Sequence, residues 1–116
     1  MRYYVAVVDG GVVGYVLWTE KSGFRSDVVL ELEQIAVLPS HRRQGIAETL
    51  IRQSLPQVTT QLETRGSTLN TIMVTTRADN AAQKLYANVL GAKVEATIPR
   101  LFGADEVFMV SRRDPA

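Results

Sequence analysis

The sequence predicts an α/β (α+β) domain built on a mixed, mostly antiparallel sheet with helices packed on it. Two observations support this class. Strand-like apolar segments and segments with helical spacing both occur, and their order is three strands, a helix, a strand, a helix and two strands. A length of 116 residues is that of one domain, so residues 1–116 are taken as a single unit.

The first two strands are predicted at residues 3–8, YYVAVV, and 12–19, VVGYVLWT. Both segments are rich in β-branched and aromatic side chains, which favour strands. Asp9, Gly10 and Gly11 lie between them and are typical of a tight turn. The chain is therefore expected to open with an antiparallel hairpin.

The third strand, predicted at residues 28–38, has an interrupted alternation. Its sequence VVLELEQIAVL alternates leucine with Glu31 and Glu33, and the phase then slips at Gln34. A slip in a two-residue period indicates a bulge or a bend, after which the other set of side chains faces the core.

A helix is predicted from Gly45, because apolar residues recur at helical spacing from there onward. Pro56 lacks a backbone donor, so we expect an end or a kink at that residue. The spacing continues to Gly66, which is typical of a C-terminal stop. Residues 68–76, TLNTIMVTT, then read as a buried strand, and the strand–helix–strand order favours parallel pairing.

A second helix is predicted at residues 78–91, with Asp79 or Asn80 as its N-terminal cap and Gly91 as its stop. Two further strands are predicted near residues 92–101 and 106–112.

The composition excludes several classes of function. Lys and Arg number 13 against 12 for Asp and Glu, so a net charge of +1 gives no general attraction to nucleic acid or anionic membranes. The chain has no cysteine and one histidine, His41, so we predict no metal site. The apolar run GVVGYVLW is far shorter than the roughly 20 residues of a membrane span, and no signal-peptide pattern opens the chain. A cytoplasmic protein is expected.

The segment HRRQGIAETLI, residues 41–51, places Arg42 and Arg43 ahead of Gly45, where a strand ends and a helix begins. The unpaired N–H groups of a helix N-terminus and the helix dipole suit a phosphate or pyrophosphate. Gly45 and Ala47 would let such a ligand approach the backbone closely. The alternative is an ordinary solvated basic turn, and the pattern R-x-x-G-x-A alone does not decide between them.

The surrounding residues resemble the GCN5-related N-acetyltransferase (GNAT) family. LEQIAVLPSHRRQGIAETLI resembles the acetyl-CoA loop of that family, and RADNAAQKLYANVLGA resembles its second conserved segment. The order of elements from residue 3 to 112 also agrees. The resemblance implies an acyl-CoA N-acyltransferase fold with a central splayed parallel pair of strands. It further implies acetyl-CoA as co-substrate and direct acetyl transfer to a primary amine on a small molecule or peptide.

The same resemblance implies a set of coenzyme-binding residues. The backbone of Ile35 and Val37 should pair with the pantetheine arm, and N–H groups from Arg43 through Ala47 should hold the pyrophosphate. The predicted residues are Ile35, Ala36, Val37, Arg42, Arg43, Gln44, Gly45, Ile46, Ala47 and Asn80.

Acetyl transfer requires a neutral amine, so a general base assists the reaction. Aligned through the R-x-x-G-x-A pattern, Glu31 falls where histone-modifying members of the family carry a base, and Glu33 is the second candidate. The alternative is that both glutamates occupy the solvent-facing side of a strand. Their carboxylates would also attract a cationic amine acceptor.

Tyr86 is the candidate proton donor to the leaving thiolate, and here the sequence departs from the family pattern N-x-x-A-x-x-L-Y-x-x-x-G. Asn80 and Gly91 are in frame with each other, but Tyr86 is displaced by one residue, which is about 100° around a helix. Either Asp79 takes the asparagine position and one residue is inserted after Tyr86, or the helix is locally irregular. The alternative role for Tyr86 is packing at the helix edge.

Compared with the family, the sequence starts at what would be the second strand, so the first strand and two helices of the acceptor half are missing. An uncovered strand edge is a ready pairing surface, so we expect a homodimer. A large acceptor that needs an open groove is the other interpretation. The alternative function is a coenzyme A-binding module without catalytic activity.

Overall fold

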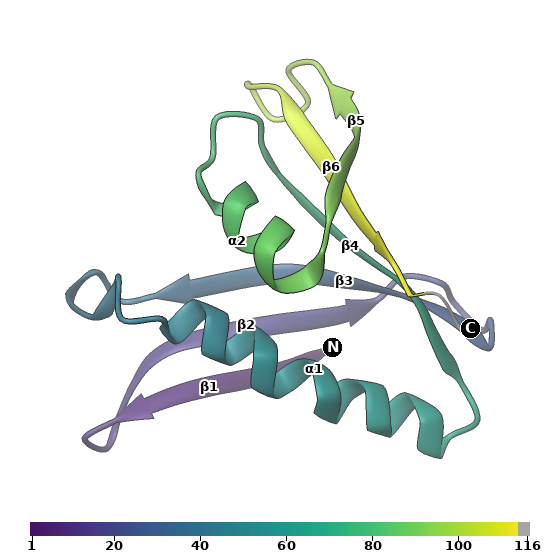
Figure 1. Ribbon diagram of the computed structural model, residues 1–116, viewed down its shortest axis with the longest axis horizontal. Coiled ribbons are helices and arrows are strands. Elements are labelled where there is room, and N and C mark those ends of the chain that lie inside the picture. Colours follow the sequence, from purple (N-terminus) through teal and green to yellow (C-terminus); the bar gives the residue numbers. More distant parts are fainter. Residues whose placement is uncertain (114–116) are drawn as a thin grey trace.

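The computed structural model describes residues 1–113 and contains six strands and two α-helices in the predicted order (Figure 1). A short 3-10 helix, η1 (Pro39–His41), follows the third strand. The elements are β1 (Arg2–Val8), β2 (Gly11–Glu20), β3 (Asp27–Val37), α1 (Ile46–Thr64), β4 (Thr68–Arg77), α2 (Ala82–Leu90), β5 (Lys93–Ile98) and β6 (Glu106–Arg112).

The strands form one sheet in the order β1-β2-β3-β4-β6-β5. All neighbouring strands pair antiparallel except β3 and β4, which are parallel and are connected through α1. The predicted mixed and mostly antiparallel sheet is therefore confirmed.

The parallel pair at the centre of the sheet is short. β3 pairs with β4 only from Asp27 to Glu31, opposite Thr68 to Met73. Beyond these residues β3 continues beside β2 and β4 continues beside β6, so the two strands diverge, as Figure 1 shows. The predicted splay is present, and it divides the sheet into two arms.

The predicted interruption in the third strand is a β-bulge at Glu33. Leu17 of β2 lies opposite Gln34 and Trp18 lies opposite Leu32, which leaves Glu33 without a partner of its own on β2. Before the bulge the even-numbered residues are buried, and after it the partly buried residues are Ile35 and others at odd positions. The bulge lies one residue before the predicted slip and produces the expected change of phase.

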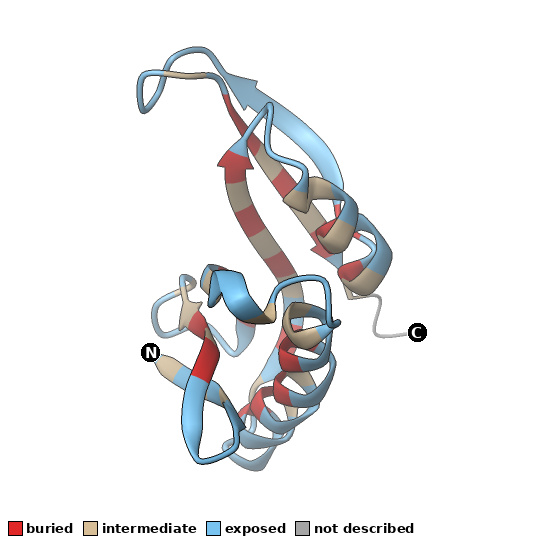
Figure 2. Ribbon diagram, turned by 90° about the vertical axis from the view of Figure 1, so that its left-hand side faces the viewer, coloured by how far each residue is buried: buried red, intermediate tan, exposed pale blue. Residues whose placement is uncertain are grey.

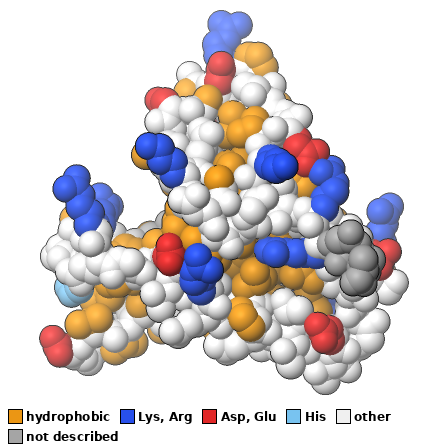
Figure 3. All heavy atoms as spheres, in the orientation of Figure 1, with side chains coloured by type: hydrophobic (Ala, Val, Ile, Leu, Met, Phe, Trp, Pro, Cys, Tyr) orange, Lys and Arg blue, Asp and Glu red, His pale blue; other side chains and the backbone are white. Residues whose placement is uncertain are grey.

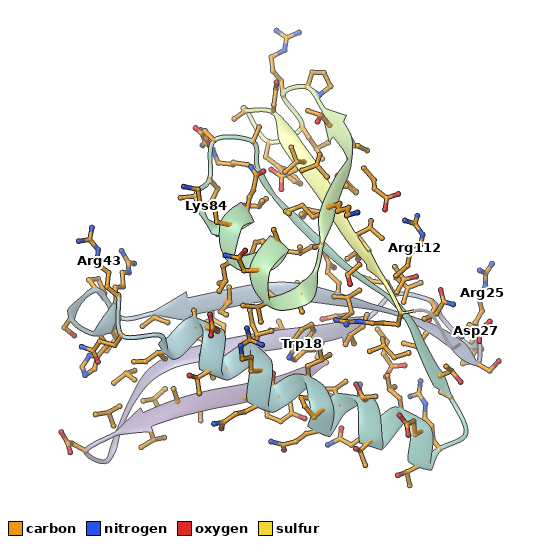
Figure 4. All side chains as sticks on the ribbon, in the orientation of Figure 1. Trp18, Arg25, Asp27, Arg43, Lys84 and Arg112 are labelled. Carbon is orange, nitrogen blue, oxygen red and sulfur yellow. The ribbon has the colours of Figure 1, made fainter. Side chains whose placement is uncertain are left out.

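Both helices lie on the same side of the sheet, where one apolar cluster joins them to the strands (Figures 1 and 2). Trp18, Leu30, Ile51 and Leu62 in this cluster are fully buried. The Trp18 indole lies between the sheet and α1 (Figure 4), and its Nε1 donates a hydrogen bond of 2.8 Å to Ser54 Oγ. Burying each large apolar side chain contributes roughly 1.5–3 kcal/mol, so this layer stabilises the molecule.

The helix boundaries agree with the prediction for α1 and differ from it for α2. α1 continues past Pro56 to Thr64, and Gly66, the predicted stop, follows its C-terminus at φ +86°. α2 begins at Ala82 and not at residue 78, because the Asn80 side chain accepts a hydrogen bond of 2.8 Å from the Ala82 N–H.

An ion-pair cluster ties β1, β2 and the end of α1 together. The Glu20 carboxylate accepts hydrogen bonds from Arg2, at 2.8 Å, and from Arg65. The hydrogen bond from the Arg65 guanidinium lowers the pKa of Glu20 most, burial opposes it by raising the pKa, and Arg2 lowers it further, so the pKa of Glu20 lies below its ordinary value. In residues 1–113, neither helix has the length and apolarity that crossing a membrane requires.

Candidate functional site

A groove of about 750 Å³ opens where β3 and β4 diverge. Its walls come from the end of β3, from the loop leading into α1 with the first turn of that helix, and from the start of α2. All the predicted coenzyme-binding residues except Gln44 line this groove. The structure thus brings together residues that are up to 45 positions apart in the chain, from Ile35 to Asn80.

The entrance to α1 is shaped by two residues with left-handed backbone conformations. Gly45, the N-terminal flanking residue of the helix, has φ +77°, and Arg43 has φ +64°. An added Cβ at Gly45 would meet no atom within 4 Å, so conformation and not crowding makes glycine favourable there. Turned amides of this kind form a concave donor surface for anions.

No side chain caps the N-terminus of α1. The first helical hydrogen bond runs from the Thr49 N–H to the Gly45 carbonyl at 3.0 Å, so the earlier amides of the helix have no intrahelical acceptor. Unpaired N–H groups of this kind, together with the positive end of the helix dipole, suit an anion.

Two arginines stand at this end of the groove. Arg42 Nε donates to the Val37 carbonyl at 3.2 Å and so folds the loop back onto β3, whereas the Arg43 side chain extends outward from the loop (Figure 4). In Figure 3 the basic side chains over this loop stand apart from the others on the same face. His41 also lines the groove, with Nδ1 2.8 Å from Ser40 Oγ.

Gly14 of β2 supports the groove from behind, and the sequence analysis missed it. A Cβ at this position would lie 2.9 Å from the Ala36 carbonyl oxygen and 3.3 Å from Val37 Cγ2. Gly14 pairs with Val37, so its missing side chain lets β2 approach the part of β3 that lines the groove. The sequence contained a feature that could have predicted this role, because an isolated glycine within a strand pattern often indicates that another backbone approaches closely.

The two glutamates do not line the groove. Glu31 lies between Thr19 and Met73 on the neighbouring strands, on the sheet face opposite the helices. Its side chain is 13% exposed and its Oε1 is 3.3 Å from Lys21 Nζ. Glu33, at the bulge, is exposed and accepts a hydrogen bond from the Thr19 hydroxyl.

Tyr86 is also separate from the groove lining. It is 6% exposed and belongs to the apolar core, while its neighbour Leu85 lines the groove. One residue along a helix turns the side chain by about 100°, which accounts for this exchange. Burial raises the pKa of the Tyr86 phenol, so the group stays protonated at neutral pH.

Three further residues at the start of α2 line the groove, and the sequence analysis did not name them as site residues. Ala81, just before the helix, and Ala82 and Leu85 within it follow Asn80 on the same wall. Leu85 is four residues after Ala81 and three after Ala82, and residues three and four apart share a helix face, which was the available signal. Within residues 1–113, the acidic and histidine side chains form no group of three or more that could hold a metal ion.

Comparison with known proteins gives a family match. Residues 1–89 match the family described as acetyltransferase (GNAT) domain. A curated N-alpha-acetyltransferase of Saccharolobus solfataricus is 37% identical in an alignment of 62 residues, and the match covers 47% of this chain and 37% of that protein. The matched part is thus little more than a third of that relative's length.

Solved structures share the fold. The NatC complex bound to Gag peptide and CoA contains a chain with a TM-score of 0.79 and 18% identity, with 97% of this chain and 71% of that chain covered. Naa50 of Arabidopsis thaliana in complex with the bisubstrate analogue CoA-Ac-MVNAL has a TM-score of 0.76 and 14% identity, with 96% and 72% covered. At these identities the likeness concerns the fold.

Proposed function

This chain belongs to the GNAT acetyltransferase family, and from that membership we propose that it transfers an acetyl group from acetyl-CoA directly to a primary amine. The observation that carries the proposal is the groove at the diverging ends of β3 and β4. A strand edge, an uncapped helix N-terminus and two arginines meet along it.

The groove offers partners for two parts of coenzyme A, the pantetheine arm and the pyrophosphate. The edge of β3 from Ile35 to Val37 offers backbone donors and acceptors to the amides of the pantetheine arm. The first amides of α1 and the turned backbone at Arg43 and Gly45 would hold the pyrophosphate. The side-chain amide of Asn80, whose oxygen is engaged by the Ala82 N–H, keeps its N–H donors for the pantetheine.

The proposed chemistry is one nucleophilic substitution at the thioester. A neutral amine forms a bond to the acetyl carbon, the carbon–sulfur bond breaks, and the amine gives up a proton while the leaving thiolate takes one. Glu31 is proposed to accept the amine proton through water, with Glu33 as the second candidate. Tyr86 is proposed to donate to the thiolate, and its raised pKa keeps the phenol in the donor form.

The acceptor is proposed to be a cationic amine. Glu31 and Glu33 place two carboxylates on the uncovered face of the sheet beside the splay. The NatC structure contains a peptide and the Naa50 structure a peptide-bearing bisubstrate analogue, which supports a peptide amine. Polyamines and aminoglycoside-like molecules fit the same charge.

A coenzyme A-binding module without catalytic activity is the second candidate. It is favoured by one observation: Glu31, Glu33 and Tyr86 all lie outside the groove lining. Coenzyme binding is tested by the melting temperature, which rises with acetyl-CoA if the folded chain binds it. Turnover is tested by thiol release from acetyl-CoA with a panel of peptides and polyamines. Binding without any thiol release would select the module, and no thermal shift would exclude both.

The substitution Tyr86→Phe separates the two candidates further. Loss of one hydroxyl keeps the ring that fills the core, so acetyl-CoA should bind as before. Thiol release should slow by about tenfold or more if the phenol donates a proton. An unchanged rate would remove Tyr86 from the mechanism.

We also propose that the chain pairs with a second copy along β1. β1 is an outer strand of the sheet, and Tyr3, Val5 and Val7 on its outward side are 61%, 55% and 58% exposed. Antiparallel pairing centred on Val5 would place Tyr3 opposite Val7 of the other copy, which is a favourable aromatic–β-branched pair. Sedimentation should show a concentration-dependent dimer that Val5→Lys abolishes, and monomer alone at micromolar concentration would contradict the pairing.

A further inference from the structure

The loop between β4 and α2, residues 78–81, sets the position of one groove wall. Asn80 and Ala81 of this loop line the groove directly across from the end of β3 and the start of α1. Because the loop belongs to the β4 arm of the splayed sheet, the contacts that hold it also fix the width of the groove.

Gln83 makes the most extensive of these contacts. Its side-chain Nε2 donates to the Ala78 carbonyl at 2.8 Å and to the Arg77 carbonyl at 3.2 Å. Both protons of the amide are therefore used on consecutive carbonyls at the end of β4. The Gln83 side chain reaches back over the loop and joins its two ends.

The other contacts of the loop lie within its own backbone turn, on the β6 side or at the surface. The Asn80 N–H donates to the Arg77 carbonyl at 3.0 Å and the Gln83 N–H donates to the Asn80 carbonyl at 3.3 Å, which closes the backbone turn. The Ala78 N–H donates to the Asp105 carbonyl at 2.9 Å and holds the loop to the β6 side alone. The Arg77–Asp79 ion pair, at 3.1 Å, joins side chains that are 60% and 71% exposed, and such surface pairs contribute little. Among residues 1–113, Gln83 is the one residue of α2 whose side chain hydrogen-bonds directly to the carbonyls at the end of β4, across the residues that line the groove.

We propose that Gln83 is a positioning residue for the coenzyme. It keeps the loop in the arrangement that presents Asn80 and Ala81 to the groove, without touching the reacting atoms itself. The inference rests on the proposed binding of coenzyme A. Gln83 does not line the groove, but it contributes to the affinity for coenzyme A by holding the loop.

Three substitutions at this position isolate the donor function. Gln83→Met keeps the length of the side chain and removes both donors. Gln83→Glu keeps the shape and sets a carboxylate against two carbonyls. Gln83→Lys restores donors on a chain long enough to reach both oxygens. The matched control is Gln57→Met, because Gln57 Nε2 donates at 3.2 Å only to Gln53 within the same helix.

Binding of coenzyme A by titration calorimetry is the first measurement. Gln83→Met should weaken binding by about tenfold, the loss expected for one to two neutral hydrogen bonds. Gln83→Lys should return to within about twofold of the wild type. Gln83→Glu should bind weakly at pH 8 and recover relative to the wild type as its carboxyl gains a proton on acidification. Gln57→Met should bind like the wild type.

Amide hydrogen exchange of residues 78–82 without ligand is the second measurement. Exchange should be faster in Gln83→Met than in the wild type and unchanged in Gln57→Met. Equal binding in wild type and Gln83→Met, failure of Gln83→Lys to rescue, or unchanged exchange would each overturn the inference. A wild type that does not bind coenzyme A would instead overturn the proposed function, and the exchange rates would still decide whether Gln83 holds the loop.

Discussion

The two halves of β3 have different neighbours. From Asp27 to Glu31 the strand is paired with β4, from Leu30 onward it is paired with β2 as well, and its alternate residues are fully buried. From Leu32 to Val37 it pairs with β2 and diverges from β4, and most of its side chains are at least partly exposed. The bulge at Glu33 lies in this second half, just after the paired segment.

This contrast separates stability from binding within a single strand. The paired half anchors the apolar core, and the diverging half leaves backbone groups at the edge of a groove. Substitutions in the first half should therefore change the free energy of unfolding, and substitutions around the second half should change coenzyme affinity.

The largest expected effect is that of Leu30→Ala in the paired half. Leu30 is 0% exposed, so its truncation should leave a cavity and lower the free energy of unfolding by about 2–5 kcal/mol. Chemical denaturation measures this loss. Val29→Ala, on the opposite and partly exposed face, is the control and should cost less. Equal losses at the two positions would contradict the assignment of the core face.

Gly45→Asp should have the next largest effect, on binding. The carboxylate would stand at the proposed pyrophosphate position, so affinity for coenzyme A should fall by about 100-fold. Gly45→Asn is the matched control, because asparagine meets the same backbone restriction at φ +77° without the charge. If both variants lost affinity equally, backbone conformation and not charge would explain the result.

Gly14→Ala should change both the free energy of unfolding and the affinity for coenzyme A, so it tests whether the two are coupled through β3. The new methyl group would meet the Ala36 carbonyl at 2.9 Å, and relieving that contact should cost about 1–3 kcal/mol of stability. Displacement of Ala36 and Val37 should also weaken coenzyme binding. Gly11→Ala, where the nearest atom is 3.7 Å away, serves as the control for both measurements. Indistinguishable results for the two variants would refute the close-approach argument.

The smallest expected effect is that of Glu20→Gln. Glu20 is the last residue of β2 and lies away from the groove. The pKa of Glu20 is lowered in the folded state, so its stabilising contribution is present above the ordinary value of 4.5 and is lost as the pH falls through the lowered value. The variant should melt at a lower temperature than the wild type at pH 7, and the difference should vanish well below pH 4.5. A difference that persists in acid would show that packing, and not ionisation, is responsible.

The sequence was sufficient to predict the elements and to group most of the residues that line the groove at the start of α1. Alternation and helical spacing are local, so the strands, the helices and the slip near Gln34 could be predicted from neighbouring residues. The start of α2 could not, because whether Asn80 begins the helix or caps it from outside depends on its side-chain hydrogen bond.

Features that depend on the register between strands or on the packing of a helix were the hardest to predict from the sequence. Gly14 matters because of its distance to Ala36, which only the pairing of β2 with β3 determines. Tyr86 and Leu85 differ by one helical step, and the packing of α2 on the sheet decides which of them faces the groove. The role of Gln83 depends on carbonyls five and six residues earlier in the chain.

The short parallel ladder between β3 and β4 has a mechanical consequence. Five paired positions, from Asp27 to Glu31, are the sheet's only seam between its two arms in residues 1–113. Such a short paired segment can act as a hinge, so a small rotation at these residues produces a larger displacement at the far ends of the arms, where the groove opens. We therefore expect a bound coenzyme to act as a brace between the arms and to slow amide exchange along the seam itself.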